Sequence, residues 1–178
     1  MESLGTHYLE EVRRQFRGYK RLVEGAIAQI SDEELFRAID PEANSIAVIM
    51  KHMAGNLRSR FRDFMTSDGE KPDRNREQEF VSDQNSRVDL LKLWEHSWGV
   101  LFDTLESLTP ADLECTVTIR AEPHSVLQAL NRQVAHHAYH AGQIVFLAKH
   151  FRGSQWNSLS IPKGQSEKFN AEAVKKFS

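Results

Sequence analysis

The sequence predicts an all-α protein: a four-helix bundle with one long crossover loop and short connecting helices. Four long stretches carry apolar side chains at steps of three and four residues, which is the period of one helix face. Turn-forming residues separate these stretches, and only one short segment has the alternation of a strand. The 178 residues suit a single domain, 1–178, in which residues 155–178 are expected to form an irregular tail.

The N-terminal part is predicted to form one long helix and one short helix. Thr6 can cap the long helix, whose apolar periodicity continues to Ile30. Ser31 and the acidic residues after it are typical of a cap and a first helical turn, so we expect a short connecting helix over residues 33–38. Pro41 then interrupts the helical structure.

A second long helix and the crossover loop follow. Ser45 is a natural cap for the helix, whose apolar face continues to about Met65. Residues 69–86 are too polar for a core, so we expect a long ordered loop in which only Phe80 and Val81 are tucked in. Loops of this length often border functional sites.

The C-terminal half supplies the remaining two long helices. Residues 87–108 predict a third helix with leucines and tryptophans on one stripe. Residues 117–120 alternate and are β-branched, so they are the candidate for a small edge strand. Ser125 opens a fourth long helix, which Gly153 closes.

Composition excludes several classes of protein. A net charge of −2 predicts no general attraction to nucleic acid or to an anionic membrane. Cys115 is the only cysteine, which excludes a disulfide framework and a cysteine-based zinc site. The chain shows no apolar signal segment and no stretch as long as a membrane span, so we expect a cytoplasmic protein.

A cluster of histidines in the fourth helix marks the candidate site. His136 and His140 lie four residues apart, so both imidazoles project from one helix face and can hold a divalent metal. His52, within the apolar face of the second helix, is a third candidate ligand, because bundle metal sites use side chains of facing helices. Three imidazoles leave a coordination position open, as in catalytic rather than structural zinc sites.

Three nearby residues are candidates for positioning those ligands. Asn56 and Gln143 lie about one turn from a histidine, and their amides either orient the ligands or make ordinary interhelix hydrogen bonds. His137 points about 100° away from His136, so it is expected either to support the ligands or to pack in the core.

Other polar and aromatic residues are assigned to surface or core. Glu95 and His96 lie beside the third-helix stripe, which is complete without them, so we expect them to face solvent. Trp94, Trp98 and Tyr139 are expected to pack in the core.

Several segments resemble the DinB-like (DinB/YfiT) superfamily, within it a branch of bacterial proteins. They are HMAGN at 52–56, DFMTSDGEKP at 63–72, TIRAEPHSVLQALNRQ at 118–133, HHAYHAGQIVFLAKH at 136–150 and LSIPKGQSEKFN at 159–170. The resemblance implies a four-helix bundle, often a homodimer, with a divalent metal such as nickel or zinc. The implied ligands are His52, His136 and His140. Relatives include thiol-dependent S-transferases and isomerases, and metal-dependent hydrolases.

The leading functional prediction is an enzyme whose divalent metal activates a small-molecule substrate, a low-molecular-weight thiol, as in an S-transferase. One alternative is metal-assisted hydrolysis, which needs a carboxylate base beside the metal, with Glu95 the first to test. Another is a non-catalytic, stress-linked or metal-sensing bundle. The apolar stripes of the first and third helices, together with the resemblance, predict a twofold homodimer, whereas a monomer would use those stripes in its own core.

Overall fold

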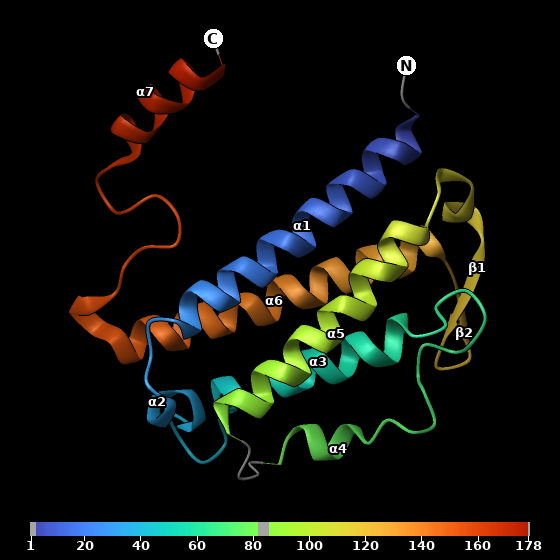
Figure 1. Ribbon diagram of the computed structural model, residues 1–178, viewed down its shortest axis with the longest axis horizontal. Helices are drawn as coiled ribbons and strands as arrows, with labels where there is room; N and C mark the ends of the chain where they lie inside the picture. Colours follow the sequence, from blue (N-terminus) through green and yellow to red (C-terminus); the bar gives the residue numbers. More distant parts are fainter. Residues whose placement is uncertain (1–2, 82–85, 178) are drawn as a thin grey trace.

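The structure is a computed structural model, which describes residues 3–81 and 86–177. Within these residues it is helical apart from one two-stranded sheet, so the predicted all-α class is confirmed. Four long helices make up most of the molecule (Figure 1): α1 (Leu4–Ile27), α3 (Ile46–Phe61), α5 (Arg87–Ser107) and α6 (Val126–Arg152).

Short elements connect the long helices or follow them. The helical ones are α2 (Asp32–Phe36), α4 (Arg76–Glu79), η1 (Pro110–Glu114), η2 (Gly153–Gln155) and α7 (Ser166–Phe177). Strands β1 (Thr116–Ile119) and β2 (Glu122–Ser125) pair antiparallel with Val117 opposite His124. The strand predicted at 117–120 is therefore present, and its partner is the segment that leads into α6.

One apolar core joins the four long helices. α3 packs against α5, α1 packs against α6, and α3 also contacts α6 (Figure 1). Trp94 and Trp98 are fully buried there with Phe16, as their aromatic stripe predicts. The prediction for Tyr139 was wrong: its side chain is 63% exposed because it lies on the solvent face of α6.

A serine caps each long helix. The Oγ atoms of Ser45, Ser86 and Ser125 each accept a hydrogen bond from a backbone N–H three residues on. The cap of α1 is Ser3 rather than the predicted Thr6, which lies in the first turn and donates its N–H to Ser3 Oγ at 3.1 Å.

The second long helix is shorter than predicted, and the crossover contains a helical turn. α3 ends at Phe61 rather than near Met65, because Arg62 is extended and Asp63 is left-handed with φ of 50°. In the crossover, residues 76–79 form α4. Phe80 is half-buried, but Val81 is 46% exposed, so the expectation that both are tucked in was wrong for Val81. Residues 82–85 lie outside the described part.

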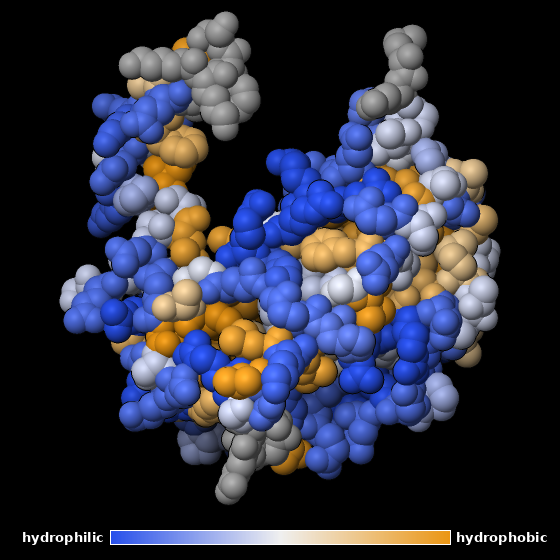
Figure 2. Space-filling view, in the orientation of Figure 1, coloured by the Kyte–Doolittle hydropathy of each residue, from blue (hydrophilic) through white to orange (hydrophobic). Residues whose placement is uncertain are grey.

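The tail is not wholly irregular, because residues 166–177 form α7. Their composition, with lysine, glutamate and alanine between spaced apolar residues, favours an amphipathic helix. Leu159 packs against the core, whereas α7 stands apart from the body of the molecule (Figure 2) and its Phe169 is 50% exposed. In the described residues, no helix combines the length and apolarity that crossing a bilayer requires.

Candidate metal centre

Three histidines from two facing helices converge at one point. His52 comes from α3, and His136 and His140 come from successive turns of α6. One potential ligand atom of each lies within 4.8 Å of those of the other two. The Nε2 atoms of His52 and His136 are 3.2 Å apart, close to the roughly 3.4 Å that separates two ligands of a tetrahedral zinc ion.

Hydrogen bonds orient two of these rings. The Nδ1–H group of His52 donates to Glu79 Oε2 at 2.9 Å, and that of His140 donates to Gln143 Oε1 at 2.8 Å. Each bond fixes the tautomer in which Nε2 carries the lone pair, as in other histidine metal sites. The rings therefore hold their Nε2 atoms ready for a metal.

Glu79 is fixed in turn by Arg74. The guanidinium of Arg74 donates to both carboxylate oxygens, at 2.8 and 2.9 Å. Burial raises the pKa of Glu79, but the hydrogen bonds from His52 and Arg74 outweigh it, so the pKa lies below its ordinary value. Glu79 is thus an anion that supports His52.

The carboxylate of Glu79 lies directly against the backbone of α3 at Gly55. A Cβ atom at position 55 would lie 2.6 Å from the Cδ atom of Glu79, which is closer than real Cβ contacts allow. Glycine is therefore needed at this helical position because of close approach rather than unusual backbone angles. The glycine gives the carboxylate room beside His52.

The electrostatics keep the α6 histidines neutral. Burial, and then the neighbouring imidazoles, lower the pKa of His136 to about 2. Burial also lowers the pKa of His140. A neutral imidazole offers a lone pair to a metal. The donor set therefore fits a divalent metal with nitrogen preference, such as zinc or nickel.

A cavity of about 390 Å³ opens over the histidines. Its lining is cationic and polar, and among the described residues it includes no Asp or Glu. The lining residues besides the three histidines are Asn56, Arg60, Arg74, Arg76, Phe80, Arg120, Arg132 and Gln133. This volume suits a small molecule.

The other predicted site residues fall into two groups. Asn56 lines the cavity, and Gln143 contacts His140, so both lie beside the metal ligands. His137 lies in the core instead, fully buried beside Phe16 and Trp98. Its Nδ1–H group donates to the carbonyl of Gln133 at 2.9 Å, and burial lowers its pKa to about 4.

Glu95 and His96 lie outside the site. Both are exposed, as expected from the complete apolar stripe of α5. Glu95 accepts a hydrogen bond from Lys20 at 2.8 Å and is not part of the cavity wall. The first candidate for a catalytic base is therefore not available at the histidines.

Sequence reasoning missed Glu79 and Arg74, the pair that supports His52. They belong to the crossover, whose length alone indicated a nearby site. Nothing in the polar stretch distinguishes Glu79 from Glu77, which is exposed. The adjacent half-buried Phe80, whose ring lies 4.9 Å from that of His52, is the one local signal that the chain turns inward here.

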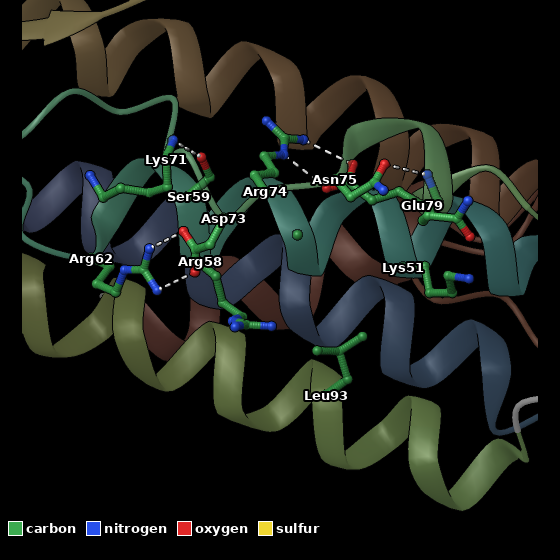
Figure 3. A pocket seen from close by; sticks show the side chains of 12 residues that line it. Lys51, Arg58, Ser59, Arg62, Lys71, Asp73, Arg74, Asn75, Glu79 and Leu93 are labelled. Atoms are coloured by element: carbon green, nitrogen blue, oxygen red, sulfur yellow. Dashed lines mark hydrogen bonds and ion pairs between the residues drawn. The ribbon is translucent and has the colours of Figure 1, made fainter.

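A second cavity, of about 280 Å³, shares Arg74 with the first (Figure 3). Lys51, Arg58, Arg62 and Lys71 line it together with Arg74, and they are accompanied by the carboxylates of Asp73 and Glu79. Asp73 is bound by Arg62 at 2.5 Å. No described histidine lines it, so this cavity offers no comparable donor set for a metal.

Comparison with known proteins identifies a family but no activity. No curated protein matches the chain. A family model described as "Protein of unknown function (DUF1572)" matches residues 3–165, which is most of the chain. The histidines, their supporting residues and the cavity all lie within the matched segment. The chain belongs to the DUF1572 family.

Proposed function

We propose that this protein is a DinB-like four-helix bundle that binds a divalent metal, nickel or zinc, and uses it to activate a low-molecular-weight thiol in an S-transferase-like reaction. The observation that carries the proposal is the convergence of His52, His136 and His140 beneath a cavity large enough for a small molecule. A bound divalent cation would supply the positive charge that keeps a thiol ionised at neutral pH.

The lining of the cavity favours thiol transfer over hydrolysis. Metal-dependent hydrolases such as the zinc proteases place a carboxylate base beside the reacting water. Glu79 is the carboxylate nearest the histidines in the described structure, but it is committed to His52 and Arg74. A thiol whose ionisation the metal maintains needs no such base, so the residues present are sufficient for it.

A purely metal-sensing or stress-linked bundle is the less favoured alternative. Such a protein needs the histidines but no space beside them. Here the cavity adjoins the ligands directly, and Asn56 and Gln133 add uncharged polar groups to its wall. These features suit the binding and orientation of a substrate.

Within this proposal each residue has a stated task. His52, His136 and His140 hold the metal; Glu79 and Gln143 hold two of the rings in the required tautomer. Phe80 packs over the His52 ring, with ring centroids 4.9 Å apart, and shields that side from water. The substrate enters from the arginine-lined side of the cavity.

We also propose that the protein is a twofold homodimer. The described core already buries much of the stripes on α1 and α5, but apolar side chains also reach the surface, among them Val88 on α5, and Tyr139 and Phe146 on α6. Tyr139 and Phe146 lie seven residues apart, on one face of α6. Sedimentation at micromolar concentration should give about twice 20.4 kDa, and a concentration-independent mass of 20.4 kDa would rule the dimer out.

One set of assays separates the functional readings. Purified protein loaded with zinc or nickel is tested for stoichiometric metal, for conjugation of cysteine and other small thiols to chlorodinitrobenzene, and for hydrolysis of nitrophenyl acetate. We expect metal-dependent conjugation that His136→Ala abolishes and that His150→Ala, an exposed site on the same helix, leaves intact. Metal-dependent hydrolysis without conjugation would favour the second reading, and bound metal with neither activity would favour the third.

A further inference from the structure

Two facing helices carry matched rows of side chains that connect the histidines to the far end of the cavity. Residues at steps of four share a helix face and lie about 6 Å apart along the axis. The rows are His52, Asn56 and Arg60 on α3, and Arg132, His136 and His140 on α6. All of them line the same cavity, so each row runs from a metal-binding end to an arginine.

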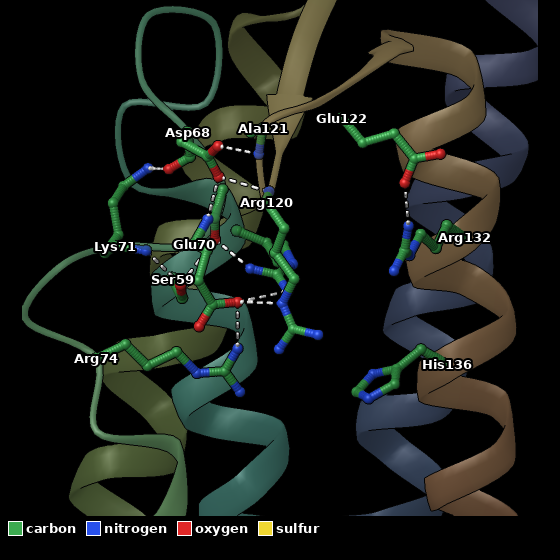
Figure 4. A network of polar contacts seen from close by, with 12 residues as sticks. Ser59, Asp68, Glu70, Lys71, Arg74, Arg120, Ala121, Glu122, Arg132 and His136 are labelled. Atoms are coloured by element: carbon green, nitrogen blue, oxygen red, sulfur yellow. Dashed lines mark hydrogen bonds and ion pairs between the residues drawn. The ribbon is translucent and has the colours of Figure 1, made fainter.

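The arginine end has too few carboxylates for its charge. Arg60 and Arg120 both donate to Glu70 Oε2, at 3.0 Å each, and Arg74 approaches the same oxygen at 3.6 Å (Figure 4). One carboxylate is thus shared by three guanidinium groups. Among the described residues, only Arg74 of the three pairs with a second carboxylate, Glu79, while Arg60 also donates to the carbonyl of Gly69. The Glu70 cluster keeps an excess of positive charge.

Arg132 adds a further cation with weak partners. Its Nη1 lies 3.9 Å from a carboxylate oxygen of Glu122 and 3.3 Å from His124 Nε2, and the side chain is 46% exposed. Figure 4 shows Arg132 and His136 projecting from α6 toward the space that Arg120 enters from the opposite side. Exposed, weakly paired guanidinium groups are free to bind an anion with two parallel hydrogen bonds.

Buried polar atoms at this end lack partners within the described structure. The Nε atom of Arg60 and the Oδ1 atom of Asn56 are both buried without a hydrogen bond, and each residue is only 5% exposed. A buried donor or acceptor without a partner costs about 1–3 kcal/mol. Because both residues line the cavity, a polar ligand in it would lie beside these atoms.

We propose that the substrate of this site is a small molecule carrying a carboxylate or phosphate group, which Arg120 and Arg132 bind while its reacting group lies at the histidines. The placement of the reacting group at the histidines rests on the function proposed above. Arg132 is one helical turn from His136, so the anionic group and the reacting atom are separated by roughly 6–10 Å. That spacing and the cavity of about 390 Å³ select a compact anionic metabolite.

The anion site can be tested without a metal. Isothermal titration calorimetry of the metal-free full chain with inorganic phosphate, and separately with succinate, should give saturable binding at one site. The anion that binds more tightly shows whether the site prefers a phosphate or a carboxylate group. The variant Arg120→Gln/Arg132→Gln should bind about ten-fold more weakly or worse. Both side chains are about half exposed, 54% and 46%, so the fold is retained, which circular dichroism verifies.

Arg62→Gln is the matched control, because Arg62 is also about half exposed but lines the second cavity. It should bind both anions as wild type does. The inference is overturned if wild type shows no saturable binding, if the double variant binds as tightly as wild type, or if Arg62→Gln abolishes binding, which would place the anion in the second cavity.

Two thiols that differ only in their terminal group test whether one molecule can bind the anion site and the metal together. With cobalt-loaded protein, whose visible absorption reports thiolate ligation, 6-mercaptohexanoate should bind about ten-fold more tightly than 6-mercaptohexanol, and the double variant should remove the difference. Equal binding of the two thiols to wild type overturns the inference but leaves the thiol proposal standing. Binding of neither thiol, with anion binding intact, refutes the thiol proposal and supports the anion site.

Discussion

The two cavities that share Arg74 have equal numbers of cationic side chains in their described linings but different chemistry. Arg74 lines both, and each lining contains five lysine or arginine side chains. Among the described residues, the cavity over the histidines adds three imidazoles and no carboxylate, whereas the second contains Asp73 and Glu79 and no histidine. Positive charge alone therefore does not define a functional site here. The distinguishing features are lone pairs held in place by hydrogen bonds.

The largest expected difference between the cavities is in metal binding. His140→Ala should abolish stoichiometric zinc or nickel, because two imidazoles remain where three are needed. Asp73→Asn, in the second cavity, should leave metal content unchanged. Elemental analysis after dialysis measures both. An unchanged metal content in His140→Ala would show that the ligands are elsewhere.

Gly55→Ala should weaken metal binding by about 10–100-fold, the cost typical of losing a residue that orients a metal ligand. The new Cβ would displace the Glu79 carboxylate, and thereby free the His52 ring. Chelator competition gives the affinity.

Two further variants test whether Gly55→Ala acts through Glu79. Gly99→Ala, in α5 with open space around it, should keep full metal affinity and raise the free energy of unfolding by up to about 1 kcal/mol. Glu79→Gln should lower affinity as Gly55→Ala does, and the combined variant should lose little more. If the losses of metal affinity in the two single variants add up in the combined variant, Gly55 does not act through Glu79.

The metal-free histidine cavity should also make stability depend on pH. The folded-state pKa of His136, about 2, lies below the ordinary 6.5, so the unfolded chain takes up a proton that the folded chain does not. This stability is present above pH 6.5 and is lost as pH falls, by about 1.4 kcal/mol per pH unit for one proton. Urea unfolding between pH 7 and 5 should show a shallower dependence in His136→Gln than in wild type. If the free energy of unfolding depends equally on pH in wild type and His136→Gln, His136 is not the source of the dependence.

The smallest effect should come from the ion pair of the second cavity. Arg62 and Asp73 are 43% and 57% exposed, so solvent screens their interaction. Arg62→Ala should leave metal content and the urea midpoint unchanged within error. A clear loss of metal in this variant would mean that the two cavities are not chemically separate.

Periodicity predicted the helices well because each long helix buries an apolar face. It also brought His136 and His140 onto one face of α6, since their spacing of four is a property of the helix itself. The same reasoning failed for Tyr139, because an aromatic residue beside a site can face solvent as well as the core. The prediction of Thr6 as the cap was wrong because Ser3, about one turn earlier, accepts the capping hydrogen bond instead.

The supporting residues could not be predicted because they depend on long-range contacts. Glu79 reaches His52 only because the crossover folds back along α3, and no local pattern marks that path. Glu95 was the alternative because it lies on a predicted helix, but its side of α5 faces Lys20 and solvent. Metal ligands on regular helices can thus be predicted from their spacing, whereas supporting residues on irregular segments cannot.

The hairpin turn between β1 and β2 links the crossover to the arginine end of the cavity. Arg120 and Ala121 have φ of 55° and 62°, left-handed values that are costly for residues other than glycine. Asp68 accepts hydrogen bonds from both backbone N–H groups, at 2.8 Å each, and lies 52 and 53 residues away in sequence. The turn gains this stabilisation only when the loop between Asp68 and Arg120 has closed. The start of the crossover therefore helps to hold the left-handed turn, and with it the position of Arg120 at the cavity.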